Sequence, residues 1–201
     1  MLGIYVHLPF CPYICPYCDF AKWPYKRSLA GRYLEALHCE IENEPAVGAS
    51  SIFFGGGTPN TYEAGELRDL IERLTRRFPN PSGHEVTIEM NPDLASRADL
   101  TTYREAGVTR LSIGVQSFDE REIRTLGRRH TQADVERVVT GAREAGIPSL
   151  SLDLIFAVPG QTPQSWRDTL RTAIALEVDH ISTYGLTVEE GTPYAVWRER
   201  E

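Results

Sequence analysis

Short apolar segments alternate with longer amphipathic segments along the whole chain. Six segments have the length and composition of β-strands, at residues 2–7, 51–54, 85–89, 110–115, 149–155 and 180–186. Between them, five segments have apolar residues at helical spacing, at residues 29–41, 64–77, 94–105, 134–144 and 165–176. Regular alternation of strand and helix predicts an α/β fold with a parallel sheet.

The predicted strands are apolar on one side only. In the third, Val86, Ile88 and Met90 alternate with polar residues, and the next two strands repeat this pattern. Strands of an open doubly wound sheet would be apolar on both faces, because helices cover both. The pattern therefore predicts a barrel-like sheet with a polar inner face. A closed eight-stranded barrel needs about 250 residues, so 201 residues predict a partial (β/α)6 TIM-like barrel.

Composition fits one domain that spans residues 1–201. Apolar residues make up 41% of the chain, which is enough for one hydrophobic core. The chain ends on the charged run Arg198-Glu199-Arg200-Glu201, with no closing element. We therefore expect a C-terminally truncated fragment.

The net charge and the hydropathy of the chain limit the classes of partner and the cellular compartment that we expect. The formal net charge of −7 argues against a nucleic-acid partner. No apolar run approaches the roughly 20 residues that span a bilayer, and the N-terminal apolar stretch is too short for a signal peptide. We expect a cytoplasmic protein that does not span a membrane.

Three cysteines lie close together after the first predicted strand. Cys11, Cys15 and Cys18 are separated by three and two residues, and thiolates at such spacing bind zinc or iron-sulfur centres, which usually take four ligands. A set of three leaves one position open for a substrate. The alternatives are a zinc knuckle completed by His7 or Cys39, and a disulfide. Because Cys39 lies within a predicted helix, we expect it to be a small buried apolar residue.

Two further groups have the residue types of a binding site. The glycines Gly55 to Gly57 directly follow the second strand, where they suit either a close approach of backbone to ligand or a tight structural turn. Glu89, Gln116 and Asp153 lie on the inner side of three strands, toward the carboxyl ends, where barrel enzymes assemble their sites. The alternative is that these polar residues only satisfy one another inside the barrel.

These motifs together resemble a known superfamily. The Cys-x3-Cys-x2-Cys loop with Tyr17 before its last cysteine, and the run Gly55-Gly56-Gly57-Thr58-Pro59, resemble the radical SAM superfamily. The wider pattern is similar to the oxygen-independent coproporphyrinogen III oxidase family, and this similarity covers nearly the whole chain. Its segments are YVHLPFC at 5–11, SIGVQSF at 112–118, LGR at 126–128 with His130, DLI at 153–155 and PGQT at 159–162.

The resemblance implies a cofactor, its ligands and a reaction. Cys11, Cys15 and Cys18 would bind a 4Fe-4S cluster, and S-adenosylmethionine (SAM) would complete its coordination. An electron donor would reduce the cluster, which would then cleave SAM. The residues implied to contact SAM are Tyr5 near the methionine sulfur, Tyr17 near the adenine, Gly56, Gly57 and Thr58 at the amino end, and Glu89, Gln116, Arg128 and Asp153.

One position separates the two branches of this family. In the family that this chain resembles, the oxidases have the motif Cys-x3-Cys-x2-Cys-x-Cys. This chain has Phe20 at the position of the last cysteine. This difference favours the HemW-type haem chaperones, for which the resemblance implies haem as a ligand and a haem-accepting protein as a partner. Oxidative decarboxylation of coproporphyrinogen III is the alternative, and a zinc-binding structural domain is a third. The haem-binding motif of the chaperone branch would lie beyond residue 201.

Four other polar residues are weaker candidates for tetrapyrrole contacts. Arg124 and Arg129 would meet the propionates of a tetrapyrrole, and His7 and His130 are candidate haem ligands. For both histidines the alternative is an ordinary hydrogen-bonded role.

Overall fold

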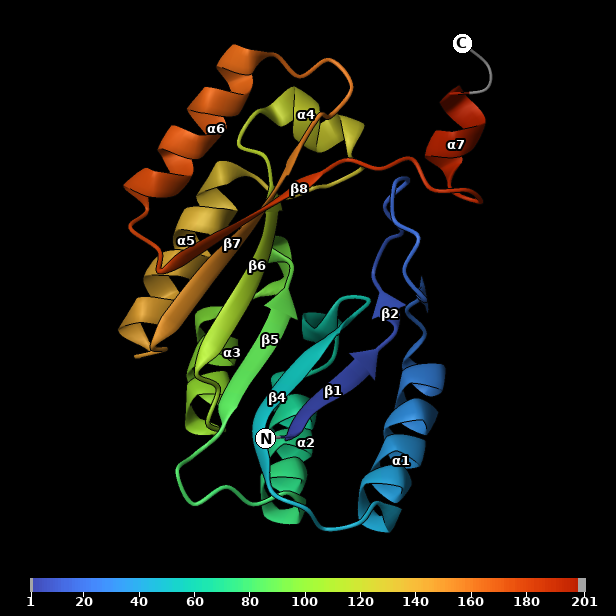
Figure 1. Ribbon diagram of the computed structural model, residues 1–201, viewed down its shortest axis with the longest axis vertical. Coiled ribbons are helices and arrows are strands. Elements are labelled where there is room, and N and C mark those ends of the chain that lie inside the picture. Colours follow the sequence, from blue (N-terminus) through green and yellow to red (C-terminus); the bar gives the residue numbers. More distant parts are fainter. Residues whose placement is uncertain (1, 199–201) are drawn as a thin grey trace.

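All six predicted strands are present, and they form one parallel sheet (Figure 1). The computed structural model describes residues 2–198. The six strands adjoin in the sheet in the order in which they occur in the chain, and a helix lies between each two of them, so each connection is a β/α unit. The strands are, in sheet order, β1 (Leu2–Leu8), β4 (Ala49–Gly56), β5 (Glu85–Met90), β6 (Arg110–Gln116), β7 (Ser149–Phe156) and β8 (His180–Gly185).

The sheet is a partial (β/α)6 barrel, as the one-sided apolar pattern predicts. Within residues 2–198, the first and last strands, β1 and β8, do not pair with each other, so the barrel stays open. Most of the charged run at residues 198–201, on which the expectation of a fragment rests, lies outside the described residues.

Five helices cover the outer side of the sheet and correspond to the predicted ones (Figure 1). They are α1 (Arg27–Asn43), α2 (Ala64–Arg77), α3 (Arg97–Glu105), α5 (Gln132–Glu144) and α6 (Pro163–Ala175). Shorter elements add α4 (Glu120–Thr125), α7 (Pro193–Arg198) and the 3-10 turns η1 (Pro59–Thr61) and η2 (Pro92–Leu94).

The predicted start of the third helix was wrong by three residues. Residue 94 belongs to η2, and α3 begins at Arg97 because Ser96 caps it. The Ser96 hydroxyl accepts from the Asp99 amide at 3.2 Å, and the Asp99 carboxylate accepts from the Ser96 amide at 2.8 Å. This capping box fixes the first turn.

The apolar and polar sides of the strands separate as expected. Val86 and Ile88 are buried in the same core as Leu67 and Leu70 of α2. On the inner face the buried residues are small and polar, for example Ser151. Small polar side chains leave room near the carboxyl ends of the strands, where a cavity opens.

A second, two-stranded sheet holds the cysteine loop. β2 (Phe10–Cys11) pairs with β3 (Trp23–Pro24), and residues 12–22 form the loop between them. The Trp23 amide donates to the carbonyl of Pro9 at 2.8 Å, and the Tyr25 amide donates to the carbonyl of Cys11 at 2.8 Å. These bonds anchor both ends of the loop beside β1.

Among the described residues, no helix is long and apolar enough to cross a membrane.

Candidate functional site

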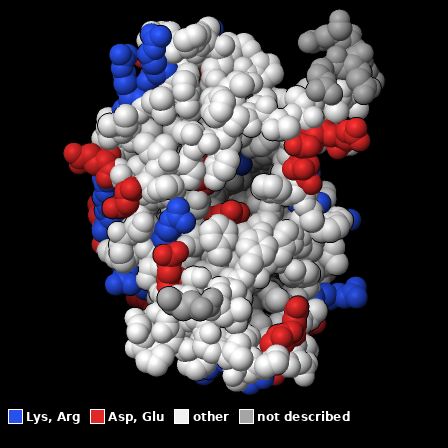
Figure 2. All heavy atoms as spheres, viewed as in Figure 1, with Lys and Arg blue, Asp and Glu red and all other residues white. Residues whose placement is uncertain are grey.

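A cavity of about 410 Å³ lies between the cysteine loop and the carboxyl ends of the strands. Its volume falls within the range of about 300–1,000 Å³ that is typical of small-molecule sites. Figure 2 shows this face hollowed near its centre, with both acidic and basic side chains at the hollow. Every residue predicted to bind the cluster or SAM, except Tyr5, lines the cavity: Cys11, Cys15, Tyr17, Cys18, Gly56, Gly57, Thr58, Glu89, Gln116, Arg128 and Asp153.

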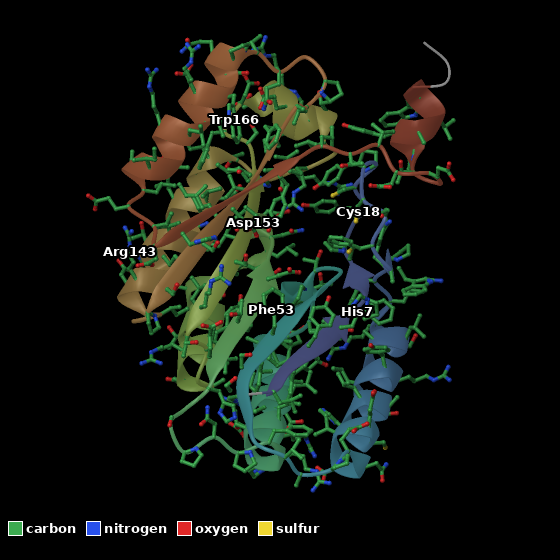
Figure 3. All side chains as sticks on the ribbon, viewed as in Figure 1. His7, Cys18, Phe53, Arg143, Asp153 and Trp166 are labelled. Atoms are coloured by element: carbon green, nitrogen blue, oxygen red, sulfur yellow. The ribbon has the colours of Figure 1, made fainter. Side chains whose placement is uncertain are left out.

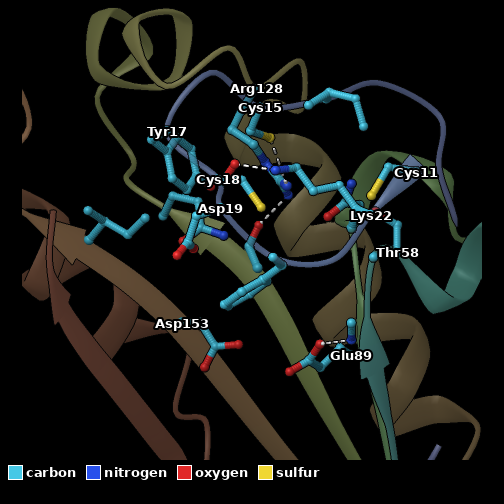
Figure 4. Close-up of a pocket in the computed structure, with 18 of the residues that line it drawn as sticks. Cys11, Cys15, Tyr17, Cys18, Asp19, Lys22, Thr58, Glu89, Arg128 and Asp153 are labelled. Atoms are coloured by element: carbon cyan, nitrogen blue, oxygen red, sulfur yellow. Dashed lines mark hydrogen bonds between the residues drawn. The ribbon is translucent and has the colours of Figure 1, made fainter. Parts of the chain in front are cut away.

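The three loop cysteines are unpaired and lie along one wall of the cavity (Figure 4). Cys11 is buried, whereas Cys15 and Cys18 are half-buried. Among residues 2–198, no three Cys, His, Asp or Glu side chains are arranged to hold a single metal ion. The fourth cysteine, Cys39, is exposed on α1, so the expectation that it is buried was wrong. The donor set at the cavity is therefore three thiols.

Burial makes two of these thiols, Cys11 and Cys18, weaker acids than usual. It raises the pKa of Cys11 and of Cys18 above the ordinary range. A hydrogen bond with Thr58 lowers the pKa of Cys11 and partly offsets the effect of burial. The positive charge of Lys22 lowers the pKa of both thiols. Soft metal centres bind the thiolate, so binding of a metal centre here would release protons.

Arg128 is a buried cation beside the loop. Its Nη2 atom donates to the carbonyl of Gly114 at 2.7 Å, and its Nη1 atom lies 4.0 Å from the sulfur of Cys15. The preceding Gly127 has a φ of +67°, and a Cβ there would come within 2.5 Å of the Pro16 ring. The turn after α4 thus packs directly on the cysteine loop and inserts the guanidinium into the cavity wall.

The glycine turn after β4 fits both of its predicted roles. Gly56 has a φ of +109°, and a Cβ on it would lie 2.5 Å from the His7 ring. A Cβ on Gly57 would lie 2.7 Å from the carbonyl carbon of Pro9. The turn therefore requires glycine for packing, and its backbone also lines the cavity. Its amides donate within the protein, from Gly57 to the carbonyl of Leu8 at 2.9 Å and from Gly56 to Glu89 at 3.3 Å, so the absent side chains open the backbone surface, and not free amides, to a ligand.

Two carboxylates lie at the side of the cavity opposite the cysteines (Figure 4). Burial raises the pKa of Glu89 to about 7, and the charge of Asp153 adds to this rise. The Gly56 amide donates to the Glu89 carboxylate at 3.3 Å, which favours its charged form. Burial also raises the pKa of Asp153, although the Ser112 hydroxyl donates to it at 2.7 Å.

Neither carboxylate has an ion-pair partner within 4.0 Å among residues 2–198. The charges of Arg110 and His180 lower the pKa of Asp153 from a greater distance, but no cation offsets the burial of Glu89, and two partly buried acids do not satisfy each other electrostatically. This argues against a purely structural role for Glu89 and Asp153. The pair suits a cationic or hydrogen-bond-donating ligand.

The aromatic and amide candidates differ in position. Gln116 ends β6 at a register irregularity with a φ of 66°, and it lines the cavity. Tyr17 is also at the cavity wall, and burial raises the pKa of its phenol. Tyr5 lies outside the lining, with its hydroxyl 3.2 Å from Nδ1 of His7 and its ring stacked on Phe53. Its proposed contact with SAM stays a prediction.

The candidate tetrapyrrole residues make local interactions. Nε2 of His7 lies 2.8 Å from the carbonyl of Ala21, and Nε2 of His130 lies 2.9 Å from that of Val115. Burial lowers the pKa of His130 to about 4. Arg124 pairs with Glu120 at 3.2 Å, and the Arg129 guanidinium lies 4.8 Å from the centre of the Tyr13 ring. In the structure, His7 and His130 therefore have the ordinary hydrogen-bonded role that was the alternative to haem ligation.

Figure 3 shows that the labelled residues around the cavity come from separate parts of the chain. Cys18 belongs to the loop after β2, and Asp153 belongs to β7. The structure adds Lys22 and Asn91 to the cavity lining, neither of which the sequence patterns singled out. For Lys22, the sequence signal that could have indicated this position is that it lies only four residues after Cys18, the last loop cysteine.

The sequence patterns also missed a buried carboxylate behind the site. Glu122 of α4 accepts hydrogen bonds from the Ser117 hydroxyl at 2.6 Å, the Ser165 hydroxyl at 2.6 Å and Nε2 of Gln161 at 2.9 Å. Gln161 in turn accepts from the amide of Ala157 at 2.8 Å. Glu122 therefore joins the loops after β6 and β7 to α4, the helix that leads to the buried guanidinium.

We expect the change Glu122→Ala to lower the free energy of unfolding by about 3 kcal/mol, because it leaves buried donors without an acceptor. Denaturant unfolding measures this loss. The control Glu120→Ala removes an exposed carboxylate from the same helix and should change stability by less than about 0.5 kcal/mol. Equal effects of the two changes would contradict the assigned role of Glu122.

Comparisons with known proteins agree with this geometry. Residues 5–173 match the family model described as the radical SAM superfamily. The chain is 39% identical to the haem chaperone HemW of Bacillus subtilis and 35% identical to that of Escherichia coli, covering 96% and 95% of this chain. Coproporphyrinogen III oxidase (HemN) of Escherichia coli, a radical SAM enzyme, superimposes with a TM-score of 0.89 at 30% identity.

The chain spans about half the length of these relatives. It covers 52% of each of the two HemW proteins and 46% of the HemN chain, whereas 98% of this chain is matched by HemN.

Proposed function

Since this chain belongs to the radical SAM superfamily and is similar to its HemW branch, we propose that it forms, over residues 1–201, the radical SAM core of a haem chaperone. It would bind a 4Fe-4S cluster and SAM at the cavity described above, and it would act with haem, an electron donor and a haem-accepting protein. The observation that carries this proposal is the cavity itself, which brings three unpaired thiols, a glycine turn and two carboxylates together.

The residues of the cavity fit the proposed cofactors. Three thiols without a fourth suit a cluster that keeps one iron open to a small molecule. Such a cluster, once reduced by one electron, would supply the electron for cleavage of SAM into methionine and a 5′-deoxyadenosyl radical. Cys39, exposed on α1, is not part of the cavity lining.

The opposite side of the cavity suits the rest of SAM. Ionised Glu89 and Asp153 would accept from its ammonium and ribose hydroxyl groups, because neither acid has an ion-pair partner within 4.0 Å in the described part of the chain. The backbone of the glycine turn would meet its amino end, where no side chain intervenes and where backbone carbonyl oxygens would accept from the ammonium group. Arg128 would hold its position through Gly114 and contribute a fixed positive charge beside the thiolates.

One side chain favours the chaperone over the oxidase. Phe20 lines the cavity and exposes 63% of its surface. It stands at the position where the oxidase motif has a further cysteine. An exposed phenyl ring supplies apolar area for a flat macrocycle but no thiol. The relatives named as haem chaperones support the same assignment. Oxidative decarboxylation of coproporphyrinogen III remains the second candidate, supported by the structural match to HemN.

The test is anaerobic reconstitution with iron and sulfide, followed by EPR of the reduced protein with and without SAM. We expect a reduced-cluster signal that changes shape when SAM is added. Titration with haem, followed by visible absorption, should then give a saturable spectral shift. Incubation with coproporphyrinogen III, SAM and a reductant should give no decarboxylated product by chromatography.

Other outcomes would separate the alternatives. Tightly bound zinc in a colourless protein would overturn the radical SAM assignment. A normal cluster with porphyrinogen turnover and no haem binding would instead establish the oxidase.

A further inference from the structure

Lys22 brings a second positive charge to the cavity. Among residues 2–198, Lys22 and Arg128 are the cations that line it. Lys22 is half-buried, and its Nζ atom donates a hydrogen bond to the carbonyl of Cys18. Figure 4 shows its side chain reaching across the cysteine side of the cavity toward Cys18. The cluster and SAM contacts proposed above involve Arg128 but not Lys22.

The backbone on both sides of Lys22 is held by hydrogen bonds to the start of the chain. Nε2 of His7 lies 2.8 Å from the carbonyl of Ala21. On the other side, the Trp23 amide donates to the carbonyl of Pro9 at 2.8 Å. Trp23 exposes 54% of its surface, whereas Lys22 lines the cavity, so these adjacent side chains lie on opposite sides of the backbone. The fold itself therefore directs the lysine inward.

The charge of Lys22 has no carboxylate partner in the described part of the chain. There, no Asp or Glu oxygen lies within 4.0 Å of its Nζ atom. The bond to a neutral carbonyl uses one of the three ammonium donors and leaves the positive charge unpaired. Ordering a lysine side chain also costs conformational entropy. An inward lysine without an acid is more readily explained by an anionic occupant of the cavity than by folding.

Lys22 acts on the same thiols that would hold the cluster. Burial raises the pKa of Cys11 and of Cys18, and the charge of Lys22 lowers both values. On the pKa of Cys18, the effect of Lys22 exceeds the opposite effect of Asp19, the acid that follows this cysteine in the sequence. A cation that favours the thiolates also favours further negative charge on the iron that they would bind.

We propose that Lys22 stabilises the reduced state of the 4Fe-4S cluster and so raises its reduction potential. This inference rests on the proposed function, because it concerns the cluster that the three loop thiols would hold. A one-electron reductant would lose one electron and the oxidised cluster would gain it, with no bond made or broken in this chain. The reduced cluster is more negative by one unit, so a fixed cation beside it lowers its free energy more than that of the oxidised cluster. Net charge is among the features that set the potentials of such clusters.

The test is a redox titration of the reconstituted protein without SAM, followed by EPR of the reduced cluster. Lys22→Met removes the charge at nearly constant side-chain length, and Lys22→Gln removes it but keeps a hydrogen-bond donor. Each change should lower the equilibrium constant for reduction by about tenfold, which for one electron moves the midpoint potential by about 59 mV to more negative values. Lys22→Arg keeps the charge and should stay within about twofold of the wild type.

Lys26→Met is the matched control. Lys26 is exposed at the start of α1 and lies outside the cavity lining, so its loss makes the same change in net charge away from the thiols. At 0.15 M salt it should change the equilibrium constant for reduction by less than about twofold, because salt screens exposed charges over about 8 Å. All variants keep the three loop thiols, so their iron and sulfide contents should equal those of the wild type.

An unchanged midpoint potential in Lys22→Met and Lys22→Gln would overturn the inference, as would an equal shift in Lys26→Met. A shift in Lys22→Met but not in Lys22→Gln would assign the effect to the hydrogen bond on the Cys18 carbonyl and contradict a role of the charge. Weaker SAM binding with an unchanged potential would show that the lysine meets the carboxylate of SAM instead. Absence of a reducible cluster in the wild type would contradict the proposed function, so the two failures are distinguishable.

Discussion

Replacing Cys15 with alanine should abolish cluster assembly. Cys15 supplies one of only three thiols at the cavity, and none of the other lining residues is a fourth cysteine. Two thiolates do not hold a cluster that normally needs at least three protein ligands. After anaerobic reconstitution, we expect iron and sulfide contents to fall more than tenfold, with loss of the brown charge-transfer absorption and of the EPR signal.

The chain offers a matched control in Cys39→Ala. This cysteine is exposed on α1 and lies outside the cavity. Its removal should leave the iron content and the EPR signal unchanged. Loss of the cluster in the Cys39 variant, or full loading of the Cys15 variant, would show that the ligand set differs from the three loop cysteines.

The position of Cys39 also shows where sequence periodicity misleads. Leu34 and Ile41, seven residues apart, share the buried face of α1. Cys39 lies two residues before Ile41, which turns its side chain by about 200° around the helix. Residue type suggested burial, but helical geometry places the thiol on the solvent side.

Strand patterns were more informative, because side chains alternate strictly across a sheet. The alternation in β5 predicted the apolar outer side and the polar inner side of a barrel-like sheet, and the chain length predicted that the barrel is partial. It also placed Glu89 and Asp153 at one end of the strands, where the structure has them lining one cavity. The carboxyl ends of parallel strands meet at one edge, so this part of the site follows from local sequence.

Contacts between distant segments could not be found in this way. Glu122 looks like a solvated residue of a short helix, yet partners from two other loops and from α6 bury it. The contact between Gly127 and Pro16, which seats α4 on the cysteine loop, likewise joins segments far apart in sequence. Local spacing has no information on such pairs.

The change Glu89→Gln should weaken SAM binding strongly, and only where Glu89 is ionised. A charge-assisted hydrogen bond contributes about 2 kcal/mol, which corresponds to a loss of about 30-fold in affinity. Because the pKa of Glu89 is about 7 in the cavity, the ratio of variant to wild-type dissociation constants should be largest near pH 8. It should approach one near pH 5.5, where the wild-type carboxyl is protonated. Equilibrium titration of the cluster-loaded protein with SAM measures both values.

Stability of the metal-free protein gives an independent readout of the same charge. The pKa of Glu89 is raised from 4.5 to about 7, so folding favours the protonated form. Its contribution to stability is full below pH 4.5 and is lost as the pH rises through 7. At pH 8 the ionised wild-type carboxylate should therefore cost on the order of 3 kcal/mol relative to Glu89→Gln, with little difference at pH 4.5.

The exposed Glu85 at the start of the same strand provides the control. Glu85→Gln should change neither SAM affinity nor the pH dependence of stability. If Glu89→Gln lost as much SAM affinity at pH 5.5 as at pH 8, the charge of Glu89 would not be what binds the ligand. A stabilised metal-free variant that binds SAM weakly at pH 8 would show that this carboxylate is kept at the expense of folding because it serves the site.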